Sequence, residues 1–273
     1  MATKHEILIR LIVFAAILTA MAWWEAVAPR RSRSFSRAKR WPANLAIATL
    51  DTVVMRIVIP LGALGFASFC TTRGWGLLNL IALPRALAVI AAVIVLDFAI
   101  YLQHVMFHAL PLLWRVHRMH HTDLDLDVTS GVRFHPIESV MSMLIKLAAI
   151  AALGPPIAGV FAFEALLNAS SLFNHSNVAI APAADALMRL LICTPDMHRV
   201  HHSIVVRETN SNFGFLVPWW DRLLGTYRSE PAAGQLGMTI GLEHFRDAHE
   251  LGLIRMVMQP WRKASLEYPI NRG

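Results

Sequence analysis

Four long apolar runs divide this chain and limit the folds open to it. They cover residues 7–26, 45–70, 86–102 and 140–172 of a 273-residue sequence. Runs of this kind, at about 1.5 Å per helical residue, reach through much or all of a bilayer core of about 30 Å. Apolar residues make up 56% of the chain and the mean hydropathy is +0.49, well above ordinary soluble domains. The sequence therefore predicts an all-α integral membrane protein.

Basic residues gather in short clusters beside these runs. The chain has 25 Lys and Arg against 18 Asp and Glu, but the clusters have the pattern of membrane topology signals, so we do not expect nucleic-acid binding. The run at 7–26 precedes the basic segment "PRRSRSFSRAKR". Cleavage after Ala28, as in a signal peptide, would leave this segment outside the cell. We therefore expect a retained helix, with residues 30–40 in the cytoplasm.

Proline interrupts two of the runs. Pro60 predicts a bend or break in the run at 45–70, and Gly154-Pro155-Pro156 divides the run at 140–172 into two arms of about 15 residues. Arms of that length rise only about 22 Å each, less than the bilayer core. We predict a hairpin that enters the membrane and returns, which keeps every histidine cluster on one side.

The organisation that follows has two parts. We expect residues 1–44 to form a transmembrane helix with a basic cytoplasmic loop, and residues 45–273 to form one membrane domain. In this domain about two helical hairpins would support a cytosolic, histidine-rich helical cap. A further amphipathic helix is predicted at residues 245–258.

Histidine clusters are the main functional signal. "HRMHH" at residues 117–121 returns 81 positions later as "HRVHH" at residues 198–202, and "HVMFH" adds an i, i+4 pair. Spacings of i, i+3 and i+4 place imidazoles on one helical face, so each cluster can present two or three nitrogens to one point. The candidate metal ligands are His104, His108, His117, His120, His121, His135, His175, His198, His201 and His202.

This set of histidines exceeds the needs of one metal ion. A zinc site takes three or four ligands, whereas two metals with four or five nitrogens each would use the whole set. Cys70 and Cys193 are the only cysteines and are too few for a sulfur-based site. A redox-active metal pair beside a lipid-facing cavity can activate O2 and oxidise an unactivated C–H bond. The pattern indicates oxidation of an acyl or sterol-like carbon.

Asp97 is the carboxylate best placed to support such a site. It lies seven residues before His104 and eleven before His108, so the three share a helical face. We expect Asp97 to support the reaction by accepting a hydrogen bond from a ligand imidazole, which would fix the orientation of that ring. The alternative is a structural ion pair with a buried cation such as Arg56.

Other acidic residues carry weaker signals. Glu138 and Asp196 are candidates for the same orienting role. Asp123, Asp125 and Asp127 alternate without the glycine and distal glutamate of a calcium-binding loop, and we interpret them as a solvated loop. His135 and His175 stand outside the clusters, and a structural role is open for each.

Six segments together resemble one family of membrane enzymes. They are "DFAIYLQHVMFH", "HRMHH", "RFHPIE", "FNHSN", "TPDMHRVHHS" and "NFGFLVPWWDRLLGTY". They resemble the fatty acid hydroxylase superfamily, also called the sterol desaturase family, in its bacterial form. The resemblance implies a di-iron oxygenase that uses O2 on a fatty acyl, sterol-like or isoprenoid lipid. It also implies a bacterial inner membrane, with the histidine boxes on the cytoplasmic side.

The resemblance assigns the ligands of the two irons by motif. The first box would be His104 and His108; the second His117, His120 and His121; the third His198, His201 and His202; and His175 the intermediate ligand. Some relatives carry another histidine where this chain has Ser171, and His135 is a candidate to replace it. Zinc can take the place of iron in a purified form.

Several questions stay open at this level. The sequence contains no haem-binding or flavin domain, so we expect electrons from a separate protein, cytochrome b5-like or a ferredoxin with its reductase. Hydroxylation and desaturation begin with the same hydrogen abstraction and are not distinguished, and neither the lipid nor the oligomeric state follows. A membrane haem or metal-transport protein is the alternative class, although its histidines would face each other within spans.

Overall fold

Helices are the only regular elements in residues 4–263 and 270, the part of the chain that the computed structural model describes. The only β-type pairing in that part is two isolated bridges. Five of its stretches are long and apolar enough to cross a membrane: Leu8–Val27, Arg37–Arg73, Arg85–Ala109, Pro136–Leu153 and Ile157–His175. The prediction of an all-α fold is confirmed, and these stretches support an integral membrane protein.

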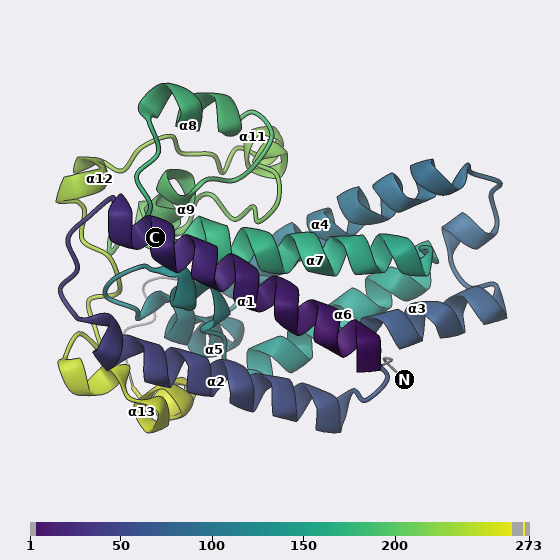
Figure 1. Cartoon of the computed structure of the whole chain (residues 1–273), viewed down its shortest axis with the longest axis horizontal. Coiled ribbons are helices and arrows are strands. Elements are labelled where there is room, and N and C mark those ends of the chain that lie inside the picture. Colours follow the sequence, from purple (N-terminus) through teal and green to yellow (C-terminus); the bar gives the residue numbers. More distant parts are fainter. Residues whose placement is uncertain (1–3, 264–269, 271–273) are drawn as a thin grey trace.

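The long helices run along the long axis of the molecule, and most of the short helices gather at one end as a cap (Figure 1). The long helices are α1 (Lys4–Val27), α2 (Arg37–Val58), α4 (Arg85–Ala109), α6 (Pro136–Leu153) and α7 (Ile157–His175). The main apolar core lies around Leu96, Ile150 and Phe163, where α4, α6 and α7 meet α3 (Gly62–Arg73). A short turn, η1 (Leu77–Asn79), leads from α3 to α4.

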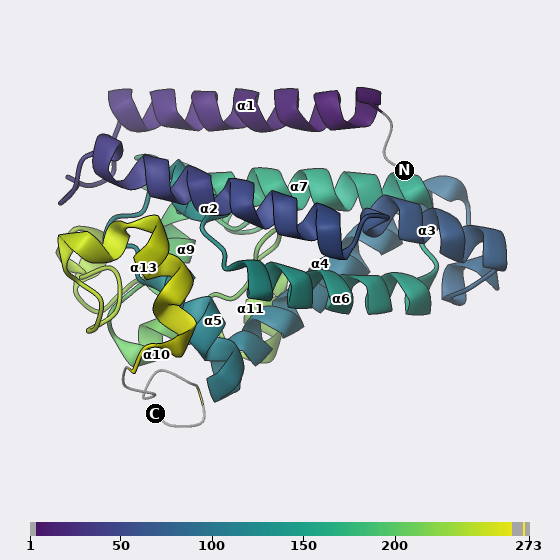
Figure 2. The same ribbon diagram turned by 90° about the horizontal axis from the view of Figure 1, so that it is seen from below.

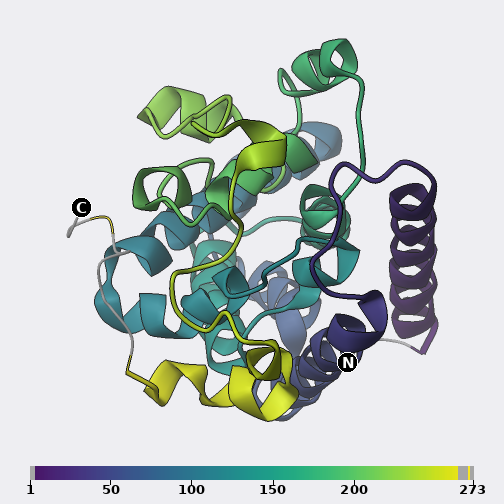
Figure 3. The ribbon, with the colours of Figure 1, turned by 90° about the vertical axis from the view of Figure 1, so that its left-hand side faces the viewer.

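Figure 3 shows the cap from the left-hand side of Figure 1. Its elements are α5 (Pro111–His121), η2 (Val128–Val132), α8 (Pro182–Met188), α9 (Pro195–His201), α10 (Val206–Thr209), α11 (Trp219–Leu224), α12 (Gly234–Gly237), η3 (Ala248–Leu251), α13 (Leu253–Met258) and η4 (Gln259–Trp261). Gly252, in an extended conformation with φ −78° and ψ 144°, separates η3 from α13. The prediction of one continuous helix over residues 245–258 is therefore wrong.

Helix α1 lies along one flank of the molecule, on the outer side of α7 (Figure 2). Leu11 and Trp23 are 59% and 67% exposed, as expected for side chains that face lipid. At its cap end Glu25 accepts hydrogen bonds from the backbone N–H groups of Val128, at 2.7 Å, and Asn177, at 2.9 Å. These bonds fasten a peripheral helix to the cap.

Both proline-based interruptions are confirmed. Helix α2 ends at Val58 and α3 begins at Gly62, so the chain breaks around Pro60. Helices α6 and α7 are separated by residues 154–156. Gly154 has φ 63°, and a Cβ there would lie 2.2 Å from the carbonyl oxygen of Trp75, so this turn needs glycine.

The predicted length of the hairpin arms is wrong. Helices α6 and α7 have 18 and 19 residues, which corresponds to about 27 and 29 Å. They extend past the apolar run because Pro136 starts α6 at the first helical position and α7 continues through polar residues to His175. The chain still returns to the cap, since His175 contacts His198.

The aspartate-rich loop is buried, which contradicts the interpretation as a solvated loop. Arg40 forms ion pairs with Asp123, at 2.7 Å, and with Asp127. Asp125 accepts the backbone N–H groups of Ser34 and Phe35 at 3.0 and 2.7 Å. Burial alone would raise the pKa of Asp123, but the arginines beside it lower that pKa to about 2. The segment after α1 covers this loop, a contact between distant parts of the chain that local spacing does not encode.

Candidate metal centre

Nine histidines from four segments meet where the spanning helices reach the cap. Two lie in the last turns of α4, three in α5, one at the end of α7, and three in α9 and its C-terminal cap. Each side chain is 3% exposed or less. They are His104, His108, His117, His120, His121, His175, His198, His201 and His202.

The two helices that carry the "HRxHH" copies are short and have defined starts. Pro111 and Pro195 occupy the beginning of α5 and α9, where the missing N–H is not needed. Thr194 caps α9 by accepting the N–H of Met197 at 3.4 Å. Both helices end with the histidines themselves, so the imidazoles project from the last turns into the molecule.

The structure divides the nine imidazoles into two groups. Within each group one nitrogen of every ring lies within 4.8 Å of the others. The five-histidine group contains His104, His108, His117, His121 and His201. The four-histidine group contains His120, His175, His198 and His202. The groups adjoin, since the rings of His121 and His202 are 4.5 Å apart.

Each "HRxHH" copy contributes to both groups. Its i and i+4 imidazoles enter one group and its i+3 imidazole enters the other, which corrects the expectation that a copy directs its nitrogens to one point. Helix geometry explains the division, because i and i+4 are about 40° apart around the axis whereas i+3 and i+4 are about 100° apart. Each short helix therefore forms part of the boundary between the groups.

The nitrogens that face each other are the Nε2 atoms. The Nε2 atoms of His104 and His117 are 3.1 Å apart, and those of His120 and His175 are 2.9 Å apart. On the far side of four rings, the Nδ1–H donates to a backbone carbonyl oxygen. The donor and acceptor pairs are His104 and Phe213, His120 and Arg133, His175 and Ser171, and His201 and Ser211. A protonated Nδ1 leaves the Nε2 lone pair directed inward.

The donor set fits bound metal ions. Burial, followed by repulsion from neighbouring imidazoles, keeps the pKa well below its usual value for His120, His121, His198, His201 and His202. These rings are therefore neutral, as metal ligation requires. In the described part of the chain the buried Nε2 of His201 has no hydrogen-bond partner. Facing lone pairs with no proton between them are stabilised by a cation.

His135 lies outside both groups. Its Nδ1 accepts the N–H of Ile137 at 3.2 Å, and its Nε2 donates to the carbonyl oxygen of Val257 at 3.1 Å. Both nitrogens are thus used in starting α6 and in holding the C-terminal part of the cap. His135 does not take the position that the resemblance suggested, beside the histidine missing at Ser171.

Ser171 marks the difference between the two groups. It lies four residues before His175 on α7, and its hydroxyl donates to the carbonyl oxygen of Gly131 at 2.7 Å. A histidine at this position would share a helical face with His175. The serine leaves the second group with four imidazoles.

Glu138, not Asp97, contacts a histidine of the groups. Glu138 Oε1 accepts the Nδ1–H of His117 at 2.6 Å. Asp97 accepts the indole N–H of Trp220 at 2.8 Å and the backbone N–H of Leu216 at 3.3 Å. Asp97 therefore connects α4 to α11 and to the segment before it, and these partners do not include Arg56.

Two further polar groups hold rings or helices of this region. Asn210 Oδ1 accepts the Nδ1–H of His108 at 3.1 Å, a role that no spacing in the sequence indicated. Asp196, the other acidic candidate, pairs with Arg30 at 2.9 Å and with Arg199. It fastens α9 to the segment that follows α1, and its hydrogen bonds to described residues involve arginine and glutamine but no imidazole.

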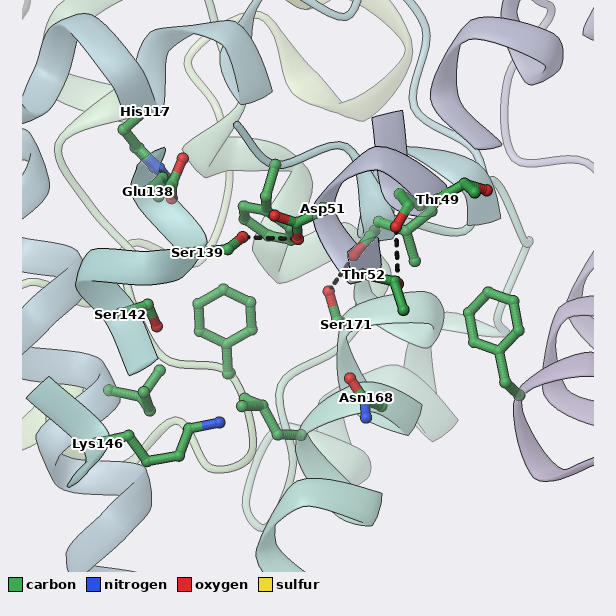
Figure 4. Close-up of a pocket in the computed structure, with 18 of the residues that line it drawn as sticks. Thr49, Asp51, Thr52, His117, Glu138, Ser139, Ser142, Lys146, Asn168 and Ser171 are labelled. Atoms are coloured by element: carbon green, nitrogen blue, oxygen red, sulfur yellow. Dashed lines mark hydrogen bonds and ion pairs between the residues drawn. The ribbon is translucent and has the colours of Figure 1, made fainter. Parts of the chain in front are cut away.

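A cavity of about 700 Å³ reaches the five-histidine group from between α1, α2, α4, α6 and α7. His104 and His117 form part of its wall, together with Phe107, Phe134 and Phe215. This volume suits a ligand rather than a few waters. Figure 4 shows that polar side chains also surround the space, among them Asp51, Glu138, Ser142, Lys146 and Asn168.

The family model for fatty acid hydroxylases matches residues 89–226, which contain the nine histidines of both groups. The chain therefore belongs to the fatty acid hydroxylase family, and the resemblance noted in the sequence is confirmed.

Curated relatives fit the same family. The chain is 31% identical over 158 residues to the ornithine lipid hydroxylase OlsE of Rhizobium tropici, covering 57% of this chain and 47% of that protein. It is 26% identical over 152 residues to the alkylglycerol monooxygenase of Homo sapiens, covering 55% and 32%, and similarly to that of Danio rerio. The matches thus span less than half the length of these relatives. No solved structure matches the chain.

The geometry predicts different metal losses for two histidine variants. His120→Ala removes one of four nitrogens in the second group, so we expect the metal content per chain to fall to about half. His135→Ala is the matched control, because His135 has no nitrogen directed into either group. Elemental analysis of both purified variants measures the difference, and equal metal content in the two would contradict the assignment.

Glu138 and Asp97 provide a second comparison. Glu138→Gln keeps the shape but weakens the bond to His117 Nδ1, and we expect metal affinity or activity to fall about 10- to 100-fold. Asp97→Asn should affect thermal stability more than metal affinity, since its partners are Trp220 and the backbone. Metal titrations and melting curves of both variants separate the two roles. If Asp97→Asn loses more metal than Glu138→Gln, the roles of the two carboxylates are the reverse of those assigned here.

Proposed function

We propose that this protein is a membrane-bound di-iron oxygenase that hydroxylates or desaturates a C–H bond of a lipid with O2 and external electrons. The observation that carries the proposal is the pair of adjoining histidine groups at the end of a cavity between apolar helices. The two named relatives, an ornithine lipid hydroxylase and an alkylglycerol monooxygenase, act on lipids by name and support the same class of substrate.

The residues present define how such a centre would be held. The five-histidine group would bind one iron and the four-histidine group the other, and the bound pair would supply O2 activation for oxidation of a C–H bond. Backbone carbonyl oxygens fix the tautomers of four of the rings, and Glu138 orients His117. Phe107 and Phe215 make the wall beside the histidines apolar and restrict water there.

Iron is proposed over zinc because the reaction needs a redox-active metal, and zinc has no redox chemistry. Zinc follows closely in affinity for nitrogen ligands and can occupy the same site in purified protein. A haem is disfavoured by the packing of the rings. Ring centroids of His175 and His198 are 4.4 Å apart, and those of His104 and His201 are 4.5 Å apart, which leaves no flat slot for a macrocycle.

Electrons are proposed to come from a separate protein, either cytochrome b5-like or a ferredoxin with its reductase. The described part of the chain forms the spanning helices and the histidine cap and contains no domain of the type that binds a flavin or a dinucleotide. The choice between an alcohol and an alkene product depends on where the lipid carbon lies relative to His104 and His117, the histidines that reach the cavity.

Incubation with isotopically labelled O2 tests the proposed activity. The iron-loaded protein in membranes, given a reducing system, should convert one lipid of the extract to a product that carries one labelled oxygen or has lost two hydrogens. His120→Ala is the control and should give neither product, because it lacks one nitrogen of the four-histidine group. Mass spectrometry of the lipids reads both outcomes. If neither the parent protein nor the variant changes any lipid of the extract, the proposed function is wrong.

The histidine cap is proposed to face the cytoplasm of a bacterium, with the protein in the inner membrane. The segment after α1 is rich in arginine, and Arg30, Arg31 and Arg40 bond to residues of the cap. Basic segments next to spans are retained in the cytoplasm. The cap and this segment therefore share one side.

Cysteine labelling tests the orientation. In a protein with Cys70 and Cys193 replaced by alanine, Ser34→Cys and Ser229→Cys place exposed thiols on the cap side. Thr72→Cys places an exposed thiol at the end of α3, away from the cap. A reagent that does not cross the inner membrane should label only position 72 in intact cells. Labelling of positions 34 and 229 instead would show the opposite orientation.

A further inference from the structure

The end of α8 and helix α11 carry large apolar side chains on the outside of the cap. Leu191 and Leu223 are 64% and 74% exposed. The two elements are joined, because the indole N–H of Trp219 donates to the carbonyl oxygen of Leu190 at 2.7 Å. We call the exposed residues Leu187, Leu190, Leu191, Leu223 and Leu224 the leucine surface. A gathering of exposed apolar side chains marks contact with a partner or with a membrane.

The leucine surface lies beside the spanning part of α4. The ring centroids of Trp220, on α11, and Phe98, on α4, are 4.7 Å apart, and the hydroxyls of Tyr101 and Thr226 share a hydrogen bond of 2.8 Å. Phe98 belongs to the apolar run at 86–102 and lies about 6 Å before its end. Figure 1 shows α8 and α11 next to each other at the top of the view. An element of the cap thus packs against the part of α4 that crosses the membrane.

The lipid-facing side of α4 continues into this contact. Ile94, Phe98 and Leu102 follow one another at intervals of four residues and share a helical face. Ile94 and Leu102 are exposed, whereas Phe98 between them is partly covered and contacts Trp220. Acyl chains that contact α4 on this face therefore also lie next to α11. The leucine surface continues the apolar surface that α4 presents to the bilayer.

Hydrogen bonds within the protein use the donors of this region. Residues 190–192 donate their backbone N–H groups to carbonyl oxygens of α8. Both indole N–H groups of α11 are paired, that of Trp219 with the carbonyl oxygen of Leu190 and that of Trp220 with Asp97. Polar groups that are already paired cost little to move from water to an apolar environment. The short, irregular segment after α8 can therefore enter the edge of a bilayer.

Aromatic and basic residues lie next to the leucine surface. The guanidinium of Arg222 is 4.0 Å from the ring centroid of Tyr227, and it donates to the carbonyl oxygen of Arg189 at 3.1 Å. Trp219 is partly exposed beside them. Tryptophan and tyrosine are enriched at the level of the lipid headgroups, and arginine can keep its charge there while its stem lies on apolar surface. This combination favours a bilayer as the partner of the surface.

We propose that the leucine surface inserts among the lipid acyl chains of the leaflet on the cap side. Helix α11 and the end of α8 then form a membrane contact in addition to the spanning helices, at the depth where an interfacial helix buries its apolar face. The partner is the leaflet itself, since the surface is continuous with the lipid-facing side of α4 at Ile94 and Leu102.

Insertion of α11 has a consequence for the histidine groups. Asp221 of α11 accepts the backbone N–H of Phe213 at 2.8 Å, and the carbonyl oxygen of Phe213 accepts the Nδ1–H of His104 at 2.8 Å. The lipid contact is thus connected to a ring of the five-histidine group through two residues. Holding α11 in the leaflet fixes the depth of the candidate metal centre relative to the lipid.

Fluorescent labelling in phosphatidylcholine vesicles tests the insertion. Leu191→Cys and Leu223→Cys are made in the cysteine-free protein and labelled with an environment-sensitive fluorophore. We expect blue-shifted emission at both positions and quenching by lipids that carry a nitroxide on the acyl chain close to the headgroup. Ile90→Cys, at an exposed position of α4, is the lipid-facing control. Ala233→Cys, exposed beside α12 at the far left of Figure 1, is the control in water.

The quenchers distinguish the possible partners of the surface. Quenching by the lipid at positions 191 and 223 should resemble that at position 90 and be several-fold stronger than that at position 233. Quenching by iodide in the water, as at position 233, would overturn the proposal. Protection from both quenchers would also overturn it and would assign the surface to a protein partner or a second copy of this chain.

Photo-crosslinking provides a measurement on the unmodified chain. Phospholipids with a diazirine on the acyl chain are added to membranes that contain the parent protein, and the peptides are analysed by mass spectrometry after irradiation. We expect lipid adducts on peptides that contain residues 187–192 and 219–224, and none on residues 230–237. Adducts on α4 but on neither of the first two segments would contradict the insertion of the leucine surface.

Discussion

Burial of nine imidazoles at one place is the constraint on which the rest of this structure depends. Several of their Nε2 atoms approach to about 3 Å, so the rings must be held in fixed orientations. Backbone carbonyl oxygens, Asn210 and Glu138 accept hydrogen bonds from the Nδ1–H groups of six of these rings and hold them in place. The cap is built around this need. Short helices with proline starts present the histidines, and the loops between them supply the acceptors.

The spanning helices serve two purposes along their length. The last turns of α4 and α7 deliver His104, His108 and His175, while their middle parts line the cavity with α1, α2 and α6. Polar residues within these helices are therefore concentrated on the faces that surround the cavity.

Short stretches of the sequence were enough to predict many features of the fold and of the site. Apolar runs predicted the spans, Pro60 and Gly154-Pro155-Pro156 predicted the interruptions, and the repeated histidine spacing marked the residues that meet in the site. These features depend on helix rise, helix period and the conformational limits of proline and glycine, which act within a few residues. The arm lengths of the hairpin were underestimated because hydropathy alone does not mark where a helix ends.

Contacts between residues far apart in the sequence decided the features of the site that the sequence did not predict. Asp97 and Glu138 are both acidic residues near histidine boxes, and only the packing of α6 against α5 places Glu138 on His117 while Trp220 takes Asp97. Arg40 buries an aspartate loop that spacing alone described as solvated. The sequence by itself determined which histidines lie on helical faces. The tertiary structure alone decided that each "HRxHH" copy serves two groups and that His135 serves neither, because a helix fixes the angles between side chains but not the partners they meet.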